Sequence, residues 1–307
     1  MSGLSRRLTS SNTAAAGVII MLVGLFMFAL NDAMGKWLVA SFSVGQILLV
    51  RSIGAFIVLG PLMTRRGGVQ ALLHPERPLL QAMRVVCATA DTGFFYAAVA
   101  YLPLADVMTF YMAGPIYVAA LSHFLLGERV GWRRWCAIFV GFIGVIIVLR
   151  PSSASLTWPS LFALLGSLSL ALTLILSRLL RSTSDSVLVT WQFVGSLLIG
   201  AVLSIGVWKM PDLPNLYALL MLGVVSCIAH MMMTRSLKIA SASLLAPLQY
   251  TLLLWAIVMG WIFFGDVPDS QILIGSAVII VAGLFIFHRQ KVVGVSAESE
   301  TATVRKA

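Results

Sequence analysis

The sequence has few charged residues and few cysteines. Asp, Glu, Lys and Arg together make up 10% of its 307 residues, whereas hydrophobic residues make up 60%. A soluble domain usually carries about 25% charged residues, so this composition excludes an ordinary soluble protein. The three cysteines, Cys87, Cys136 and Cys227, all lie within apolar stretches. We therefore expect free thiols that pack as small hydrophobic groups, and no disulfide.

Motifs for catalysis are also lacking. The sequence has no His-Glu-x-x-His pair for a zinc site, and Gly265-Asp266 lacks a second convergent aspartate motif. The segments between apolar stretches are short, so no separate domain is expected to hold a soluble active site. We predict no enzyme activity, cofactor or metal, and an intramembrane enzyme is a remote alternative. A purely structural protein would leave the charged residues inside the apolar stretches unexplained.

Long apolar stretches are the main feature that is present. Each is roughly 18–24 residues long, which is enough to cross a hydrocarbon core of about 30 Å. They predict an all-α membrane protein with ten transmembrane helices. The stretches lie near residues 15–38, 44–62, 79–102, 104–126, 132–149, 157–180, 186–208, 214–236, 243–264 and 270–288.

The positive charges are distributed asymmetrically along the chain. A net charge of +10 would suggest nucleic-acid binding in a soluble protein. With the N-terminus inside, however, sixteen Lys and Arg fall on the inner side, and only Lys36, Arg150 and Lys209 fall on the outer side. This positive-inside bias predicts a multi-pass protein of a bacterial-type inner membrane with both termini cytoplasmic, and no nucleic-acid partner. The N-terminus lacks a cleavable signal pattern, so we expect the first span to remain.

An internal repeat divides the chain into two halves. Residues 125–130 (LLGERV) and 263–268 (FFGDVP) each close one long apolar stretch and precede one more. Because each half has five crossings, the second copy is expected to be inverted in the membrane. We predict a cytoplasmic N-terminus (1–14), a first five-helix repeat (15–150), a second (151–289) and a disordered cytoplasmic tail (290–307). In this alignment Lys36 corresponds to Arg178, and Arg51 to Gln192.

Several segments carry a family resemblance. They are residues 29–36, 46–51, 102–105, 114–115, 127–129 and 246–251, followed by Gly265-Asp266. Through them the chain resembles the ten-helix EamA-type members of the drug/metabolite transporter superfamily, including its amino-acid exporters. The resemblance implies a transporter. Family members move amino acids, nucleotide-like metabolites, polyamines and toxic cations, and many export. Asp266 departs from the pattern, which usually has Glu there.

Ionisable residues inside the predicted spans are candidate pathway residues, because a charge at mid-bilayer is costly. Asp32 and Arg51 fall at the same depth in the outer half of adjacent spans, so we expect an ion pair that serves either transport or only helix packing. Asp91 lies near the midplane and is predicted to line a cavity or respond to protons. His230 is a further candidate, although a neutral histidine bonded to a neighbouring helix is the favoured interpretation.

Two other basic residues lie closer to the ends of their spans. Lys36 and Arg84 are expected to extend their charged groups to the outer and inner interfaces respectively.

Aromatic and amide residues complete the candidate site. Their spans are those that the resemblance implies to line the central space, and aromatic rings suit apolar side chains and cations. Pro115 and Pro247 lie inside spans, where each removes a backbone hydrogen bond and can kink the helix. The candidates of this class are Tyr96, Tyr111, Trp191, Gln192, Gln249, Tyr250 and Trp255.

The predicted function is alternating-access transport of a small amphipathic substrate across the lipid bilayer. Amino-acid export, aromatic amino acids included, is favoured because Asp, Arg and aromatic residues would meet an ammonium, a carboxylate and an apolar side chain. The alternatives are uptake of a nucleoside-like or aromatic metabolite and efflux of drugs or organic cations. Small residues such as Gly144 and Gly275 indicate a tight packing face, which forms either a scaffold or a homodimer contact.

Overall fold

The computed structural model describes residues 2–65, 68–73, 75–125, 132–149, 157–180, 182–239, 246–282 and 284–285. The first half contains α1 (Ser2–Val39), α2 (Val44–Arg65), the short α3 (Gly68–Leu73), α4 (Pro78–Val99), α5 (Leu104–Met112), α6 (Gly114–Leu125) and α7 (Trp132–Leu149). The second half contains α8 (Trp158–Leu179), α9 (Asp185–Leu203), α10 (Leu213–Ile239), the 3-10 helix η1 (Ala246–Tyr250) and α12 (Thr251–Phe264). A last helix covers Ser270–Ala282.

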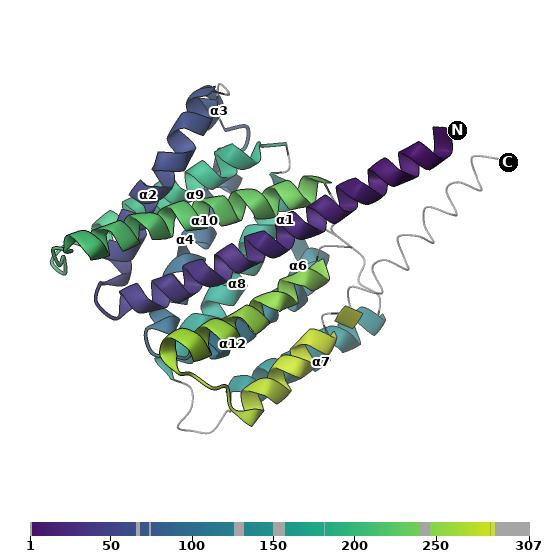
Figure 1. Cartoon of the computed structure of the whole chain (residues 1–307). Helices are drawn as coiled ribbons and strands as arrows, with labels where there is room; N and C mark the ends of the chain where they lie inside the picture. The colour runs from purple at the N-terminus through teal and green to yellow at the C-terminus, as the bar shows by residue number, and fades with distance from the viewer. Residues whose placement is uncertain are drawn as a thin grey trace.

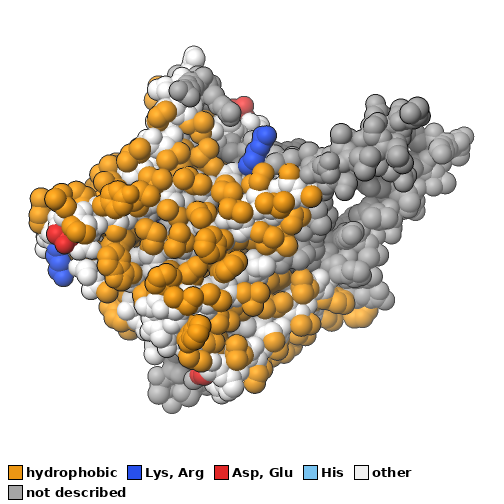
Figure 2. All heavy atoms as spheres, in the orientation of Figure 1, with side chains coloured by type: hydrophobic (Ala, Val, Ile, Leu, Met, Phe, Trp, Pro, Cys, Tyr) orange, Lys and Arg blue, Asp and Glu red, His pale blue; other side chains and the backbone are white. Residues whose placement is uncertain are grey.

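The fold is that of an all-α membrane protein, and each of the ten predicted spans falls on helix. Five helical segments are long and apolar enough to cross a membrane: Ala15–Val39, Val44–Thr64, Trp158–Ser177, Ser186–Leu203 and Leu213–Met233. Shorter apolar helices account for most of the rest. Hydrophobic side chains cover most of the face in Figure 2, as expected for a surface in contact with lipid. The predicted tail, 290–307, lies outside the described residues.

Two spans depart from a regular α-helix near the prolines that the sequence marks as possible kinks. The fourth span is divided into α5 and α6, with Ala113 as the residue between them. In the ninth span, the described residues start with η1, which includes Pro247, and continue directly as α12. Proline lacks an N–H and clashes with the preceding helical turn, so each break follows from the local sequence.

Helices of one half pack mainly on helices of the other. The most extensive contacts join α1 to α10, α2 to α9 and α10, and α4 to α8, while α5 meets α12. Figure 1 shows α1 and α10 running side by side. If the two halves are exchanged, α1–α10 becomes α8–α4, α2–α10 becomes α9–α4, and α2–α9 maps onto itself. The contacts therefore follow the repeat, and the core lies between the halves.

Glycines allow two of these helices to approach closely. A Cβ added at Gly223 of α10 would lie 1.8 Å from the Arg51 carbonyl oxygen, and one at Gly54 of α2 would lie 2.1 Å from the Leu220 carbonyl oxygen. Only glycine permits such backbone contact. The α2–α10 crossing therefore holds Arg51 directly against the other half.

The last helix of each half also uses small residues. A Cβ at Gly144 of α7 would lie 2.8 Å from Ile279 and 3.2 Å from the Gly275 carbonyl oxygen. The small residues singled out in the sequence thus pack α7 against the Ser270–Ala282 helix within one chain.

Candidate substrate-binding site

Arg51 of α2 connects the two halves. Its side chain is buried, with 4% of the residue exposed. Nη1 donates to the Tyr96 hydroxyl (2.9 Å), and Nη2 donates to Ser226 Oγ of α10 (2.5 Å). The guanidinium carbon lies 5.5 Å from the Tyr96 ring centre and 5.7 Å from that of Phe193. Nε has no hydrogen-bond partner within the described part of the chain.

Asp32 and Arg51 do not form the predicted ion pair. Asp32 Oδ1 instead accepts a hydrogen bond from Nδ2 of its neighbour Asn31 (3.0 Å), and Arg51 is directed toward α4 and α10. The two charges still interact at longer range. The prediction was wrong because equal depth in the membrane does not fix how each helix is rotated about its axis.

Asn31 is a polar residue that the sequence analysis did not select. It is 4% exposed, and its Oδ1 has no hydrogen-bond partner among the residues that the structure describes. It lies close enough to Tyr96 to act on its hydroxyl group. Its position beside Asp32 in an apolar span was a signal that could have identified it.

Asp91 of α4 belongs to the same cluster. The Tyr111 hydroxyl of α5 donates to Asp91 Oδ1 (2.8 Å), and the Asp91 charge interacts with those of Asp32 and Arg51. Asp32 and Asp91 are only partly buried, unlike Arg51. The structure thus brings together five of the predicted residues, from α1, α2, α4 and α5: Asp32, Arg51, Asp91, Tyr96 and Tyr111.

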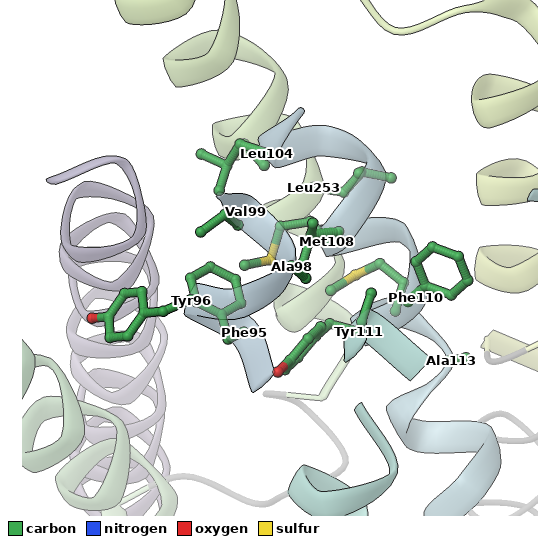
Figure 3. Packing of buried hydrophobic residues seen from close by; sticks show 14 of the residues in the cluster. Phe95, Tyr96, Ala98, Val99, Leu104, Met108, Phe110, Tyr111, Ala113 and Leu253 are labelled. Carbon is green, nitrogen blue, oxygen red and sulfur yellow. The ribbon is translucent and has the colours of Figure 1, made fainter. Parts of the chain in front are cut away.

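Tyr96 links this cluster to the packed core. It is fully buried on α4, and a Cβ at Gly35 of α1 would lie 2.2 Å from its ring. In Figure 3 the Tyr96 ring points away from the neighbouring Phe95 and Tyr111. The Phe95 ring centre lies 5.6 Å from those of both Tyr96 and Tyr111. The ring of Phe95 therefore lies between the two tyrosine rings and packs against both.

Among the described residues, His230 bonds within its own helix and not to a neighbouring helix as the favoured interpretation expected. Its Nδ1 lies 2.8 Å from the carbonyl oxygen of Ser226, on the same helix. Its ring packs edge-on against Phe28 of α1 (4.6 Å between ring centres) and Phe193 of α9 (6.3 Å). The histidine nevertheless borders the cluster, because Ser226 also binds Arg51 and Phe193 lies beside the guanidinium. Ser226 and Phe193 were missed, since an isolated Ser or Phe in an apolar span gives no signal.

The other candidates of the second half lie apart from the charges. Trp255 packs edge-on against Phe26 of α1, with ring centres 5.0 Å apart. Within the described residues, no hydrogen bond or ring contact joins these candidates to Asp32, Arg51 or Asp91. Trp191 Nε1 and the Tyr250 hydroxyl have no hydrogen-bond partner there either. The residues concerned are Trp191, Gln192, Gln249, Tyr250 and Trp255.

Arg84 does not extend to the interface as predicted. Only 6% of the residue is exposed. Its Nε donates to Ser177 Oγ of α8 (2.7 Å), and Nη1 donates to the Leu188 carbonyl oxygen of α9 (3.0 Å). The prediction was wrong because the contacts of α4 with α8 and α9 supply acceptors within reach of the side chain. Arg84 joins three helices.

Lys36 also has a partner in the protein instead of reaching the interface alone. Its Nζ lies 2.5 Å from Asp266 Oδ2 and 4.6 Å from the centre of the Phe264 ring. Gly265, with a left-handed φ of +68°, ends α12 and turns the chain so that Asp266 can meet α1. The pair connects the first helix of one half to the fourth span of the other. Glu128, the counterpart of Asp266 in the first repeat, lies outside the described residues.

Known proteins share this architecture. The EamA-like transporter family matches residues 15–150 and 157–288. A riboflavin transporter of Rhizobium johnstonii is 26% identical over 90% of this chain and 92% of its own length. An S-adenosylmethionine uptake transporter of Rickettsia bellii is 26% identical (91% and 96%), and the pseudopaline exporter CntI of Pseudomonas aeruginosa is 27% identical (90% and 97%).

A solved crystal structure also shows the same fold. It aligns over 89% of this chain and 97% of its own, with a TM-score of 0.63 at 15% identity. The chain therefore belongs to the EamA-like transporter family of the drug/metabolite transporter superfamily, and is a multi-pass membrane transporter and not an enzyme.

Proposed function

We propose that this protein exports amino acids, aromatic ones included, or similar small zwitterions across a bacterial inner membrane by alternating access. The observation that carries the proposal is the cluster of Asp32, Arg51 and Asp91. It brings side chains of both signs of charge within electrostatic reach of one another, and Arg51 also binds Ser226 of the other half. An ammonium and a carboxylate on one small molecule would each meet an opposite charge there.

Alternating access fits the way in which the halves pack. Most contacts cross from one half to the other and exchange under the repeat. An inverted repeat of this kind has two equivalent arrangements, each open to one side of the membrane. The Lys36–Asp266 pair joins the two halves, and we infer that it closes one end of the pathway in the present arrangement. If both termini are cytoplasmic, this end faces the outside of the cell. Reporter fusions after Arg66, Arg134 and Lys238 test that orientation and should report a cytoplasmic location.

Uptake of a nucleoside-like or aromatic metabolite is the second candidate. It is favoured by relatives named for riboflavin and S-adenosylmethionine, since both compounds contain a heteroaromatic ring. The rings of Phe193 and Tyr96 beside Arg51 would suit such a ring. S-Adenosylmethionine also carries an amino-acid group and would fit both candidates. Relatives are named for uptake and for export, so direction has to be measured.

Counterflow in proteoliposomes tests the function. Purified protein would be reconstituted and assayed with amino acids, nucleosides, riboflavin and organic cations, with and without a pH gradient. We expect counterflow of amino acids above that of protein-free liposomes and of liposomes with Arg51→Gln. Counterflow confined to riboflavin or nucleosides would favour the second candidate. Counterflow confined to organic cations would contradict both.

A further inference from the structure

We propose that Arg51 binds the carboxylate of the substrate through its Nε–H edge. This inference rests on the proposed function, because it assigns one group of a zwitterionic substrate to one side chain. It makes Arg51 the residue that distinguishes acids from their neutral analogues.

The protein holds the Arg51 guanidinium in a fixed orientation. The group is planar and presents five N–H donors in a rigid fork. Tyr96 and Ser226 hold its two Nη atoms, and the rings of Tyr96 and Phe193 lie close to it. The Nε edge is the part that has no acceptor among the described residues.

Leaving this edge unpaired is unfavourable. A buried donor without a partner costs about 1–3 kcal/mol, and more when it is charged. A buried cation without a carboxylate in contact is also costly. Neither Asp32 nor Asp91 forms an ion pair with Arg51, although both interact with it at longer range. An incoming carboxylate oxygen would supply the missing acceptor and the counter-charge together.

Arg84 shows that burial alone does not produce an open Nε. The two arginines are almost equally buried, at 4% and 6% exposure. Arg84 Nε donates to Ser177, and a backbone carbonyl accepts from Nη1. The Nε of Arg84 thus donates a hydrogen bond, whereas the Nε of Arg51 has no acceptor among the described residues.

The neighbouring residues favour a carboxylate within a zwitterion over a phosphate. Asp32 and Asp91 belong to the same cluster, so their charges would repel a doubly charged phosphate more than a carboxylate. Asn31 Oδ1 is buried and has no hydrogen-bond partner among the residues that the structure describes. It lies beside Asp32 and would accept from an ammonium. The cluster thus offers the Arg51 Nε–H as a donor to a carboxylate, and the side-chain oxygens of Asn31 and Asp32 as acceptors from an ammonium.

The test compares three probes that differ at one position: phenylalanine, phenylalaninamide and phenethylamine. Each would compete with labelled phenylalanine in counterflow, and its binding to purified protein would be measured as well. For the unaltered protein we expect phenylalanine to bind at least about tenfold more tightly than the amide, as for loss of one charged hydrogen bond. Arg51→Lys keeps the positive charge but removes the Nε edge, and should bring the acid-to-amide ratio close to one.

Arg84→Lys is the matched control. It changes the same residue type at equal burial and should keep the acid-to-amide ratio, even if it lowers thermal stability. If Arg51→Lys fails to fold, Ser226→Ala tests the same point, because it leaves Arg51 in place without its Nη2 anchor. It should reduce the ratio by a smaller factor, about threefold for one weakened hydrogen bond.

The outcomes separate this inference from the proposed function. If phenylalanine is transported but neither Arg51→Lys nor Ser226→Ala changes the acid-to-amide binding ratio, the role of Arg51 is overturned and the proposed function stands. Equal binding of acid and amide by the unaltered protein would overturn it too. If no amino acid is transported, the function fails. In that case S-adenosylmethionine and its decarboxylated form replace the probes, and equal binding of these two compounds would overturn the inference as well.

Discussion

The two buried arginines have opposite relations to the protein around them. Arg84 donates from Nε and Nη1 to α8 and α9, and joins three helices. Arg51 is held at both Nη atoms, but its Nε has no acceptor in the described part of the chain. Buried polar groups are normally paired, so the unpaired Nε of a buried cation requires an explanation, and at Arg51 we infer a ligand. The same residue type thus serves packing in one place and recognition in the other.

Replacing each arginine by glutamine should separate the two roles most strongly. Arg84→Gln removes interhelical hydrogen bonds from a buried cation and should cost about 3 kcal/mol of stability. Arg51→Gln should reduce transport about tenfold to hundredfold, since a charged hydrogen bond contributes about 1.5–3 kcal/mol. Melting temperature and counterflow would be measured for both. A large stability loss at Arg51 together with a transport loss at Arg84 would reverse the assignment.

Asp32→Asn tests whether the acidic side of the cluster acts independently of Arg51. Because the two residues do not form an ion pair, Asp32→Asn and Arg51→Gln should each impair transport. The double variant should show roughly additive losses in stability and no rescue of expression. Expression restored by the double change would instead indicate a direct pair, as equal depth alone suggested.

Hydropathy predicts more of this fold than of its site. The apolar stretches locate ten helical spans, and Pro115 and Pro247 mark the broken ones, because both signals act locally in sequence. Contacts between spans depend on how each helix is rotated, which depth does not determine. That is why Arg51 reaches Tyr96 and Ser226 instead of Asp32, and why Lys36 meets Asp266, 230 residues away.

Tyr111→Phe should have an intermediate effect. It removes the hydroxyl that donates to Asp91 and leaves the ring packing against Phe95 unchanged. Losing one hydrogen bond to a carboxylate should weaken substrate binding by about threefold to tenfold, with little change in melting temperature. Tyr117→Phe is the control, because the Tyr117 ring packs against Phe142 with 5.5 Å between ring centres, and no hydrogen bond among the described residues joins its hydroxyl to Asp91. Equal effects of the two changes would remove Asp91 from the site.

Lys36→Ala and Asp266→Asn should have the smallest effect. The pair is partly exposed, with side-chain accessibilities of 14% and 26%, and such pairs contribute about 0.2–1 kcal/mol. We expect up to about fivefold faster labelling of a cysteine at Phe264 by a membrane-impermeant thiol reagent added outside. Cys87, Cys136 and Cys227 would be replaced first. Labelling that both changes leave unaltered would show that the pair does not close this end.

Substrate-dependent labelling between the halves tests the central claim most directly. In the protein without its native cysteines, single cysteines would be placed at Tyr111 and Tyr250, in the broken spans of the two halves. If the site opens alternately to each side, a saturating transported substrate should change the labelling rate at both positions, in opposite directions for reagent added outside and inside. Labelling at both positions that ignores every transported substrate would contradict a transport pathway between the halves.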